Sequence, residues 1–111
     1  MVVQIVQFQL AGISPAEYEA HAEQVAPKFP GMPGLIAKAW LADPGSNTYG
    51  GVYLWTDRAA AEAYENGEVL AAARRNAALA GFRSSILDTL DAPTALTARA
   101  LSGLSATEAA A

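Results

Sequence analysis

The 111-residue sequence contains no cysteine and only one histidine, His21. The absence of thiols excludes a disulfide scaffold, a thiolate metal site, an iron–sulfur cluster and a cysteine nucleophile. A single imidazole leaves a Ser-His-Asp triad possible, but it excludes a multi-histidine metal site unless two chains share it. Any chemistry must therefore come from a small number of polar groups.

Positive charge is also sparse. Seven basic residues face eleven acidic ones, for a net charge of −4, and only Arg74 and Arg75 are adjacent. Nucleic-acid binding is therefore not expected, because it depends on clustered cations. The opening MVVQIVQFQL has no basic residue and no signal-peptide cleavage site, and no apolar run reaches the ~20 residues that span a bilayer. We expect a soluble cytoplasmic protein that binds neither nucleic acid nor membrane.

Large apolar side chains are fewer than the hydrophobic content of 52% suggests, because 26 residues are alanine. The length allows one domain. Residues 2–10 combine β-branched and aromatic residues and predict a strand. Ser14, Pro15 and Glu17 predict a capped helix start. The helix continues along a stripe of one buried face, made of Tyr18, His21, Ala22, Val25 and Phe29.

A hairpin is predicted next, with strands over 35–41 and 49–55 joined by a turn at 43–47. Thr56 or Asp57 caps a second helix, and Asn66-Gly67 separates it from an alanine-rich helical segment over 68–79. Alternation over 82–91 predicts a fourth strand. The remaining C-terminal segment has room for one short helix but too few large apolar residues to pack well, and we expect its end to be disordered.

The order βαββαβ predicts a ferredoxin-like α+β fold, in which a four-stranded antiparallel sheet carries both helices on one face. The domain is expected to cover 1–92, followed by a C-terminal tail over 93–111. The first two strands have large apolar residues on both sides. Val3 and Ile5 lie opposite Val6, Phe8 and Leu10, and Leu35 and Leu41 lie opposite Ile36 and Trp40. Helices cover only one side, so we predict a homodimer formed sheet to sheet.

The segment PGLIAKAWLADPGSNTYGGVYLWTDRAAAEAY, residues 33–64, resembles the YdhR-like monooxygenase family of the dimeric α/β-barrel superfamily, which also contains antibiotic-biosynthesis monooxygenases. The matching features are Pro33-Gly34, Lys38 and Trp40 two residues apart, the run GGVYLWTD from Gly50 to Asp57, and Tyr64 nine residues after Trp55. The resemblance covers most of residues 1–92. It implies a dimeric barrel with a pocket between each sheet and its own helices.

Superfamily members with known activity oxygenate polycyclic phenols without metal or flavin, degrade haem, or act as decarboxylases, isomerases or dehalogenases. Two differences between this sequence and the characterised members reduce the activities that the resemblance implies. Gly51 stands where the polyketide monooxygenases have a substrate-contacting asparagine. Tyr64 and Arg74 stand where haem degraders have a tryptophan and the haem-ligating histidine, and arginine does not ligate iron. The resemblance therefore disfavours haem degradation and implies a reaction with no cofactor and no metal.

The candidate substrate-binding residues are on the two hairpin strands. Gly51 lies on the same side as Tyr53 and Trp55, and a glycine between aromatics leaves a hollow that suits a pocket floor, unless it merely relieves crowding in the core. Lys38 and Trp40 share a face and can orient an acidic or phenolic ligand. The alternative is a lysine that lies along an aromatic surface with its head in water.

The candidate catalytic residues are His21 and Tyr64. Histidine changes charge near neutral pH, so His21 is a candidate general base, or else a boundary residue bonded to backbone or water. Tyr64 offers a hydroxyl that donates to a ligand oxygen, or else plugs the core with its hydroxyl at the surface. Arg74 and Arg75 are predicted to form helical ion pairs with nearby glutamates.

Two classes of function follow. The first is a cofactor-independent monooxygenase that acts on a small aromatic or polycyclic phenol, with a base, an apolar pocket and hydrogen bonds to the developing charge. The second is a non-catalytic dimer that binds a small aromatic molecule in the same pocket. A third possibility is an isomerase or cyclase, which needs only the same base and the same aromatic pocket walls.

Overall fold

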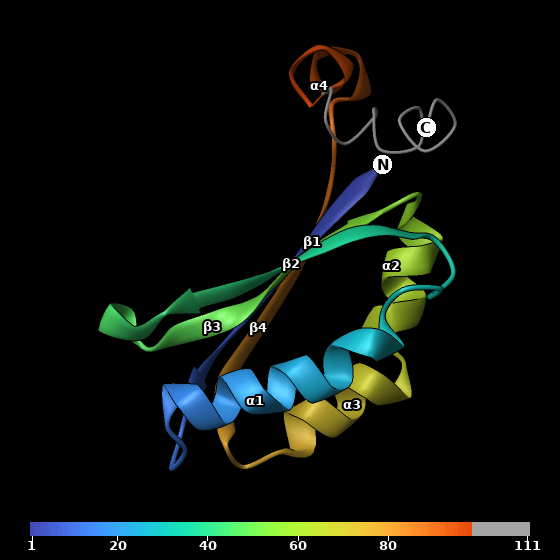
Figure 1. Ribbon diagram of the computed structural model, residues 1–111. Helices are drawn as coiled ribbons and strands as arrows, with labels where there is room; N and C mark the ends of the chain where they lie inside the picture. The colour runs from blue at the N-terminus through green and yellow to red at the C-terminus, as the bar shows by residue number, and fades with distance from the viewer. Residues whose placement is uncertain (99–111) are drawn as a thin grey trace.

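The computed structural model describes residues 1–98, which form a four-stranded antiparallel sheet with helices on one face (Figure 1). The strands lie in the order β2-β3-β1-β4. They are β1 (Val2–Leu10), β2 (Leu35–Asp43), β3 (Thr48–Trp55) and β4 (Leu79–Asp88). The helices are α1 (Pro15–Val25), α2 (Arg58–Glu65), α3 (Glu68–Arg75) and α4 (Asp91–Thr97), with 3₁₀ turns η1 (Ala26–Lys28) and η2 (Pro44–Ser46). The predicted ferredoxin-like fold is confirmed.

The helices begin where the sequence predicts. Ser14 Oγ accepts a hydrogen bond from Glu17 N at 3.1 Å, and Glu17 Oε1 accepts one from Ser14 N at 2.9 Å, so the predicted capping box starts α1. Asp57, rather than Thr56, caps α2 by accepting from Ala60 N at 2.8 Å. These two caps set the points at which the chain leaves the sheet to cover it.

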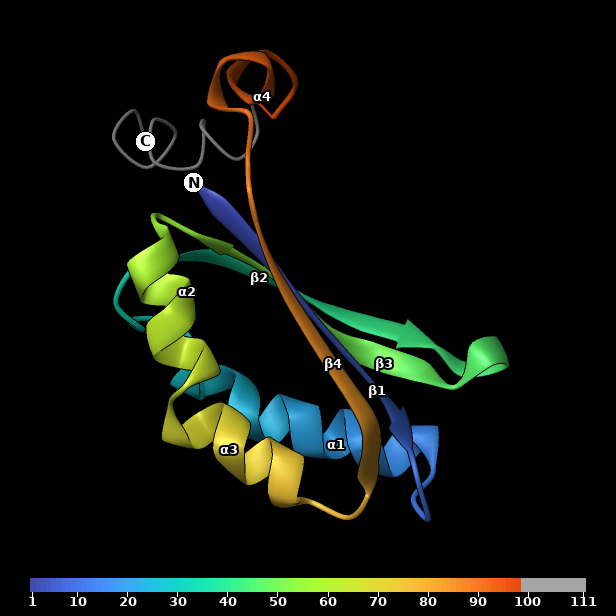
Figure 2. The ribbon, with the colours of Figure 1, turned by 180° about the vertical axis from the view of Figure 1, so that it is seen from behind.

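The alternation along β1 divides the molecule into a core side and an outer side. Val2, Gln4, Val6 and Phe8 are buried on the side that α1, α2 and α3 cover. Figures 1 and 2, seen from opposite directions, both show these helices on the same side of the sheet. The core on this side is largely aromatic, since its buried members include Phe8, Tyr18, Phe29, Tyr49, Tyr53, Trp55 and Tyr64.

The outer side of the sheet carries apolar residues that the helices do not cover. Val3 pairs with Leu54 on one neighbouring strand and with Leu87 on the other, and Ile5 pairs with Val52. Leu87 is 51% exposed, and Leu54 is buried but lies apart from the main core cluster. One assignment was wrong: a register shift between Leu35 and Ala37 turns Leu35 to the helix side, where it packs against the core instead of sharing a face with Leu41.

The boundary between α3 and β4 also differs from the prediction. The alanine-rich segment was expected to stay helical to residue 79, but α3 ends at Arg75 and β4 already begins at Leu79. The Asn76 side chain accepts a hydrogen bond from Ala78 N at 3.0 Å, which forms a tight turn. Such local competition with the helix is the physical reason for the early end.

The C-terminal part continues past the strand into α4, which extends beyond the end of the sheet beside the N-terminus (Figure 1). The expected boundary between residues 92 and 93 falls inside this helix. The expected disorder of the chain end concerns residues 99–111, which lie outside the described residues, so it stays a prediction. None of the helices within residues 1–98 is long and apolar enough to cross a membrane.

Candidate active site

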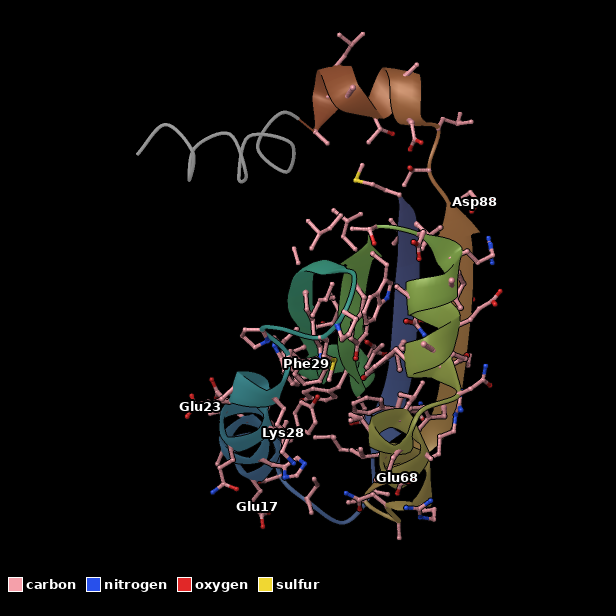
Figure 3. All side chains as sticks on the ribbon, turned by 90° about the vertical axis from the view of Figure 1, so that its right-hand side faces the viewer. Glu17, Glu23, Lys28, Phe29, Glu68 and Asp88 are labelled. Carbon is pink, nitrogen blue, oxygen red and sulfur yellow. The ribbon has the colours of Figure 1, made fainter. Side chains whose placement is uncertain are left out.

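A cavity of about 360 Å³ lies between α1, α3 and the helix side of the sheet. We call it the central cavity. Its volume falls within the range of small-molecule sites, about 300–1,000 Å³. Figure 3 looks along α1 and α3 and shows Phe29 in the space between them, with Lys28 on the α1 side and Glu68 on the α3 side. Its walls are mainly aromatic, formed by Phe8, Tyr18, Phe29, Trp40, Tyr53, Tyr64 and Phe82.

A second cavity of about 400 Å³, here the side cavity, lies between residues 32–34 and the helices α2 and α3. Tyr64 lines both cavities, and Trp55 lines only this one. Its acidic residues already have structural partners, because Asp57 caps α2 and Glu68 pairs with Arg75 at 2.7 Å. The central cavity is therefore the better candidate site, since it contains the groups that can receive a proton.

Lys38 is the most unusual of those groups. Its Nζ lies over three ring faces, 3.4 Å from the centroid of Trp40, 3.6 Å from that of Phe29 and 4.6 Å from that of Tyr53. Within residues 1–98, no carboxylate lies within ion-pairing distance of this amine and no side chain or backbone atom accepts a hydrogen bond from it. Burial lowers the pKa of Lys38 to about 7, since an apolar environment disfavours the charged amine.

Gly51 makes room for this lysine. A Cβ at position 51 would lie 2.9 Å from Lys38 Cε and 3.1 Å from Tyr53 Cε1, both closer than ordinary contacts. The hollow predicted at Gly51 therefore exists but is filled by the lysine side chain, so Gly51 lies beneath Lys38 instead of forming an open floor. The adjacent Gly50 is more restricted, because its φ is +149° and a Cβ there would lie 1.8 Å from Val6 O.

Two buried phenols meet in the same cavity. Tyr53 on β3 and Tyr64 on α2 place their hydroxyl oxygens 2.8 Å apart, within hydrogen-bond distance. Burial raises the pKa of both phenols, so both remain neutral at physiological pH. One hydroxyl must donate to the other, which leaves the acceptor's own proton available to a ligand. The pair is thus a hydrogen-bond donor and not a base.

Comparison with protein families identifies the chain. Residues 3–100 match the family model described as "Putative mono-oxygenase ydhR". The protein belongs to the ydhR family. No curated protein matches the sequence.

Solved structures with the same fold include oxygenases and haem-degrading proteins. SnoaB, a cofactor-independent oxygenase from Streptomyces nogalater, is 25% identical with a TM-score of 0.60, and the match covers 81% of this chain and 96% of SnoaB. The haem degrader MhuD from Mycobacterium tuberculosis is 23% identical with a TM-score of 0.65, covering 81% and 96% of the two chains. A putative antibiotic biosynthesis monooxygenase from Deinococcus radiodurans has a TM-score of 0.68 at 10% identity, covering 83% and 95%.

The structure of this ydhR-family protein brings together most of the residues predicted from the sequence. His21, Lys38, Trp40, Tyr53 and Tyr64 all line the central cavity. Trp55 lies outside it, in the side cavity, and stacks parallel to Tyr53 with ring centroids 6.0 Å apart. His21 was expected on the buried stripe of α1, but it is exposed and lies at the cavity rim.

Trp55 is fixed by a residue that the sequence did not single out. Its Nε1 donates to Gln4 Oε1 at 3.0 Å, and the amide nitrogen of Gln4 donates to Ser84 Oγ at 3.3 Å. Gln4 is completely buried between Val2 and Val6 on the core side of β1. The sequence does contain a signal for this role. Gln4 alternates with Val2 and Val6 on the buried face of β1, and a glutamine on a buried face needs a polar partner.

Phe29 and Tyr49 are two further residues whose roles were missed. Phe29 was predicted only as the end of a helix stripe, yet its ring contacts the rings of Trp40, Tyr53 and Tyr64. The Tyr49 hydroxyl is buried and has no hydrogen-bond partner within residues 1–98. Within the same residues, no group of three His, Asp or Glu side chains is placed to hold a metal ion.

Proposed function

We propose that this protein is a cofactor-independent monooxygenase that oxidises a small aromatic or polycyclic phenol in the central cavity. The observation that carries the proposal is the combination found there: aromatic walls, a half-buried amine and a neutral phenol pair in one space of ligand size. Membership of the ydhR family and the structural similarity to a cofactor-independent oxygenase support the same proposal.

The proposed reaction leaves the redox chemistry to the substrate. A base takes the phenolic proton, and the resulting anion passes an electron to dioxygen. The two radicals combine as a peroxide on a ring carbon, which collapses to a carbonyl with loss of water. For a ring methylene the balance is CH₂ + O₂ → C=O + H₂O, so the four electrons that reduce dioxygen all come from the substrate. The protein needs to supply only a base, hydrogen bonds and an apolar space.

Each group in the cavity has a task in this reaction. Trp40 and Tyr53 form apolar walls for the planar substrate, and Trp55 packs against Tyr64 with ring centroids 5.4 Å apart. The free O–H of the Tyr53–Tyr64 pair donates to the oxygen on which negative charge develops. Two groups of the cavity are candidates for the base, the Lys38 amine, whose pKa burial lowers to about 7, and the imidazole of His21. The first is on the aromatic wall and the second at the rim.

The proposal includes a homodimer formed through the outer side of the sheet. The helices leave Val3, Ile5, Val52 and Leu87 uncovered there, and a continuous apolar surface of this kind is typical of an interface. The same contact closes two sheets into the dimeric barrel that the family resemblance implies.

Oxygen consumption with a reduced polycyclic phenol tests the proposal. Anthrone is a suitable probe because its enol form is a fused phenol. We expect the protein to accelerate both oxygen uptake and formation of the quinone in air, with no quinone under nitrogen. Binding of several anthrone-like probes without oxygen uptake above background would contradict the oxygenase and support the non-catalytic binder. A rearranged product formed equally under nitrogen would support an isomerase or cyclase.

A further inference from the structure

Lys38 differs from an ordinary surface lysine because both its alkyl chain and its amine contact other residues of the protein. Its alkyl chain lies over Gly51, and its Nζ is enclosed by the rings of Phe29, Trp40 and Tyr53. Trp40 lies two residues after Lys38 on the same strand, β2, and we call these three rings the aromatic enclosure. Lys38 is therefore half-buried, with its amine against the rings of the cavity wall, of which Trp40 is itself partly exposed.

The other ionisable groups of the cavity do not neutralise this amine. They are Tyr18 and His21 on α1, Lys28 on η1, Tyr53 on β3, Tyr64 on α2 and Glu68 on α3. The tyrosines remain protonated because burial raises the pKa of each one. Among the described residues of the cavity the one carboxylate, Glu68, pairs with Arg75. A half-buried amine without a counter-ion favours its neutral form.

The aromatic enclosure has the opposite effect once a proton arrives. Ring faces attract a cation within about 6 Å of their centroids, and three faces lie within that distance of Nζ. The site thus suits an amine that begins neutral and ends charged. This is the behaviour required of a general base whose product is an ion pair.

We propose that Lys38 is the group that takes the phenolic proton from the bound substrate, and that the aromatic enclosure then holds the resulting ammonium beside the phenolate. In this step the O–H bond breaks with its electron pair left on oxygen, and a new N–H bond forms on Nζ. The inference rests on the proposed function for its substrate class, but the proton transfer requires no oxygen. Lys38 is preferred to His21 because the histidine is exposed at the rim.

Binding of m-nitrophenol tests this inference separately from oxygenation, because its phenolate absorbs at longer wavelength than its neutral form. At about pH 7.5, where the free probe is still mainly neutral and the Lys38 amine is mainly unprotonated, we expect the wild-type protein to convert the bound probe to phenolate. Lys38→Met, which keeps the unbranched chain but has no amine, should bind the probe in its neutral form. Lys38→Arg keeps a charge that cannot be released. It should lose at least tenfold in oxygenation rate with anthrone while still binding the preformed phenolate at higher pH.

The outcomes separate the two proposals. A probe that the wild-type protein leaves neutral, or does not bind, overturns the assignment of Lys38. The same holds if Lys38→Met ionises the probe as fully as wild type, or if Lys38→Met oxidises anthrone at the wild-type rate. An ionised probe together with no anthrone oxidation supports Lys38 as the proton acceptor and overturns only the oxygenase. Circular dichroism of each variant confirms that the fold is retained.

Discussion

The side chain of Lys38 passes directly over Gly51 on the adjacent strand, so that a Cβ at position 51 would lie 2.9 Å from the lysine Cε. This relationship links a small residue in the sheet to the position of Lys38, the more buried of the two lysines among the described residues of the cavity. It also explains the pair of glycines, Gly50 and Gly51, on β3 beside β2, the strand that carries Lys38. Gly50 allows close approach of β1, and Gly51 allows the lysine to lie flat.

Gly51→Ala should displace Lys38 without breaking the fold. The added methyl group forces Lys38 Cε and the Tyr53 ring to move by a few tenths of an ångström. We expect a stability loss of about 1 kcal/mol from overpacking and a loss of about tenfold in rate from misplacement of the amine. Urea unfolding and the rate of anthrone oxidation measure the two effects. Gly45→Ala, in the exposed η2 turn where a Cβ meets nothing closer than 3.9 Å, is the matched control. Equal rates for both variants would contradict the role given to Gly51.

Removing one hydroxyl from the Tyr53–Tyr64 pair should leave the other buried without a partner. Tyr53→Phe and Tyr64→Phe are each expected to lose about 1–2 kcal/mol of unfolding free energy. The double variant should lose less than the sum, with a coupling energy of about 1 kcal/mol in a double-mutant cycle. Tyr49→Phe is the control, because the Tyr49 hydroxyl is buried without a partner and its removal should be neutral or stabilising. Additive losses in the cycle would argue against the hydrogen bond.

The lowered pKa of Lys38 predicts how stability depends on pH. The amine is neutral in the folded protein above about pH 7 but stays protonated in the unfolded chain up to about pH 10. The unfolded state therefore binds more protons between these values, and stability rises with pH across this window. Below it, the folded protein bears a half-buried charge on Lys38. Lys38→Met should thus be stabilised relative to wild type by about 1 kcal/mol more at pH 6 than at pH 9, measured by urea unfolding at both values. A constant difference would show that Lys38 does not titrate in this window.

The dimer can be tested on the outer side of the sheet. Leu87→Asp places a charge in the proposed interface at a residue that is half exposed in the single chain, so the fold should survive. We expect wild type to show twice the chain mass of 11.5 kDa by light scattering at micromolar concentration, and Leu87→Asp to shift towards the single-chain mass. Ala20→Asp, on the exposed side of α1, serves as the control and should remain a dimer. A wild-type monomer would contradict the sheet-to-sheet assembly.

The sequence predicts much of this fold because its signals are local. The capping box at Ser14 and the alternation in β1 each determine an element from a few neighbouring residues. The predictions fail where a distant or subtle interaction decides the outcome. Leu35 changes sides through a register shift that no periodicity reveals, and Asn76 ends α3 through one side-chain hydrogen bond within an alanine-rich segment.

The candidate site is predicted less completely than the fold. The alternation of Lys38 with Trp40 places both in the cavity, but the third ring over the amine, Phe29, comes from a different part of the chain. The pairing of Tyr53 with Tyr64 joins a strand to a helix and depends on tertiary packing. His21 lies on the expected helix but at the edge of its buried face, because three residues after the buried Tyr18 the helix has turned to about 60° from it.

Isotope labelling tests the central claim most directly. Anthrone is incubated with the protein under ¹⁸O₂ in ordinary water, and the new carbonyl oxygen of the quinone is analysed by mass spectrometry. The account predicts that this carbonyl carries oxygen-18 from dioxygen at a rate far above the protein-free control, and that Lys38→Met reduces that rate at least tenfold. A quinone whose new oxygen comes from water, or labelled product formed no faster than without protein, would contradict it.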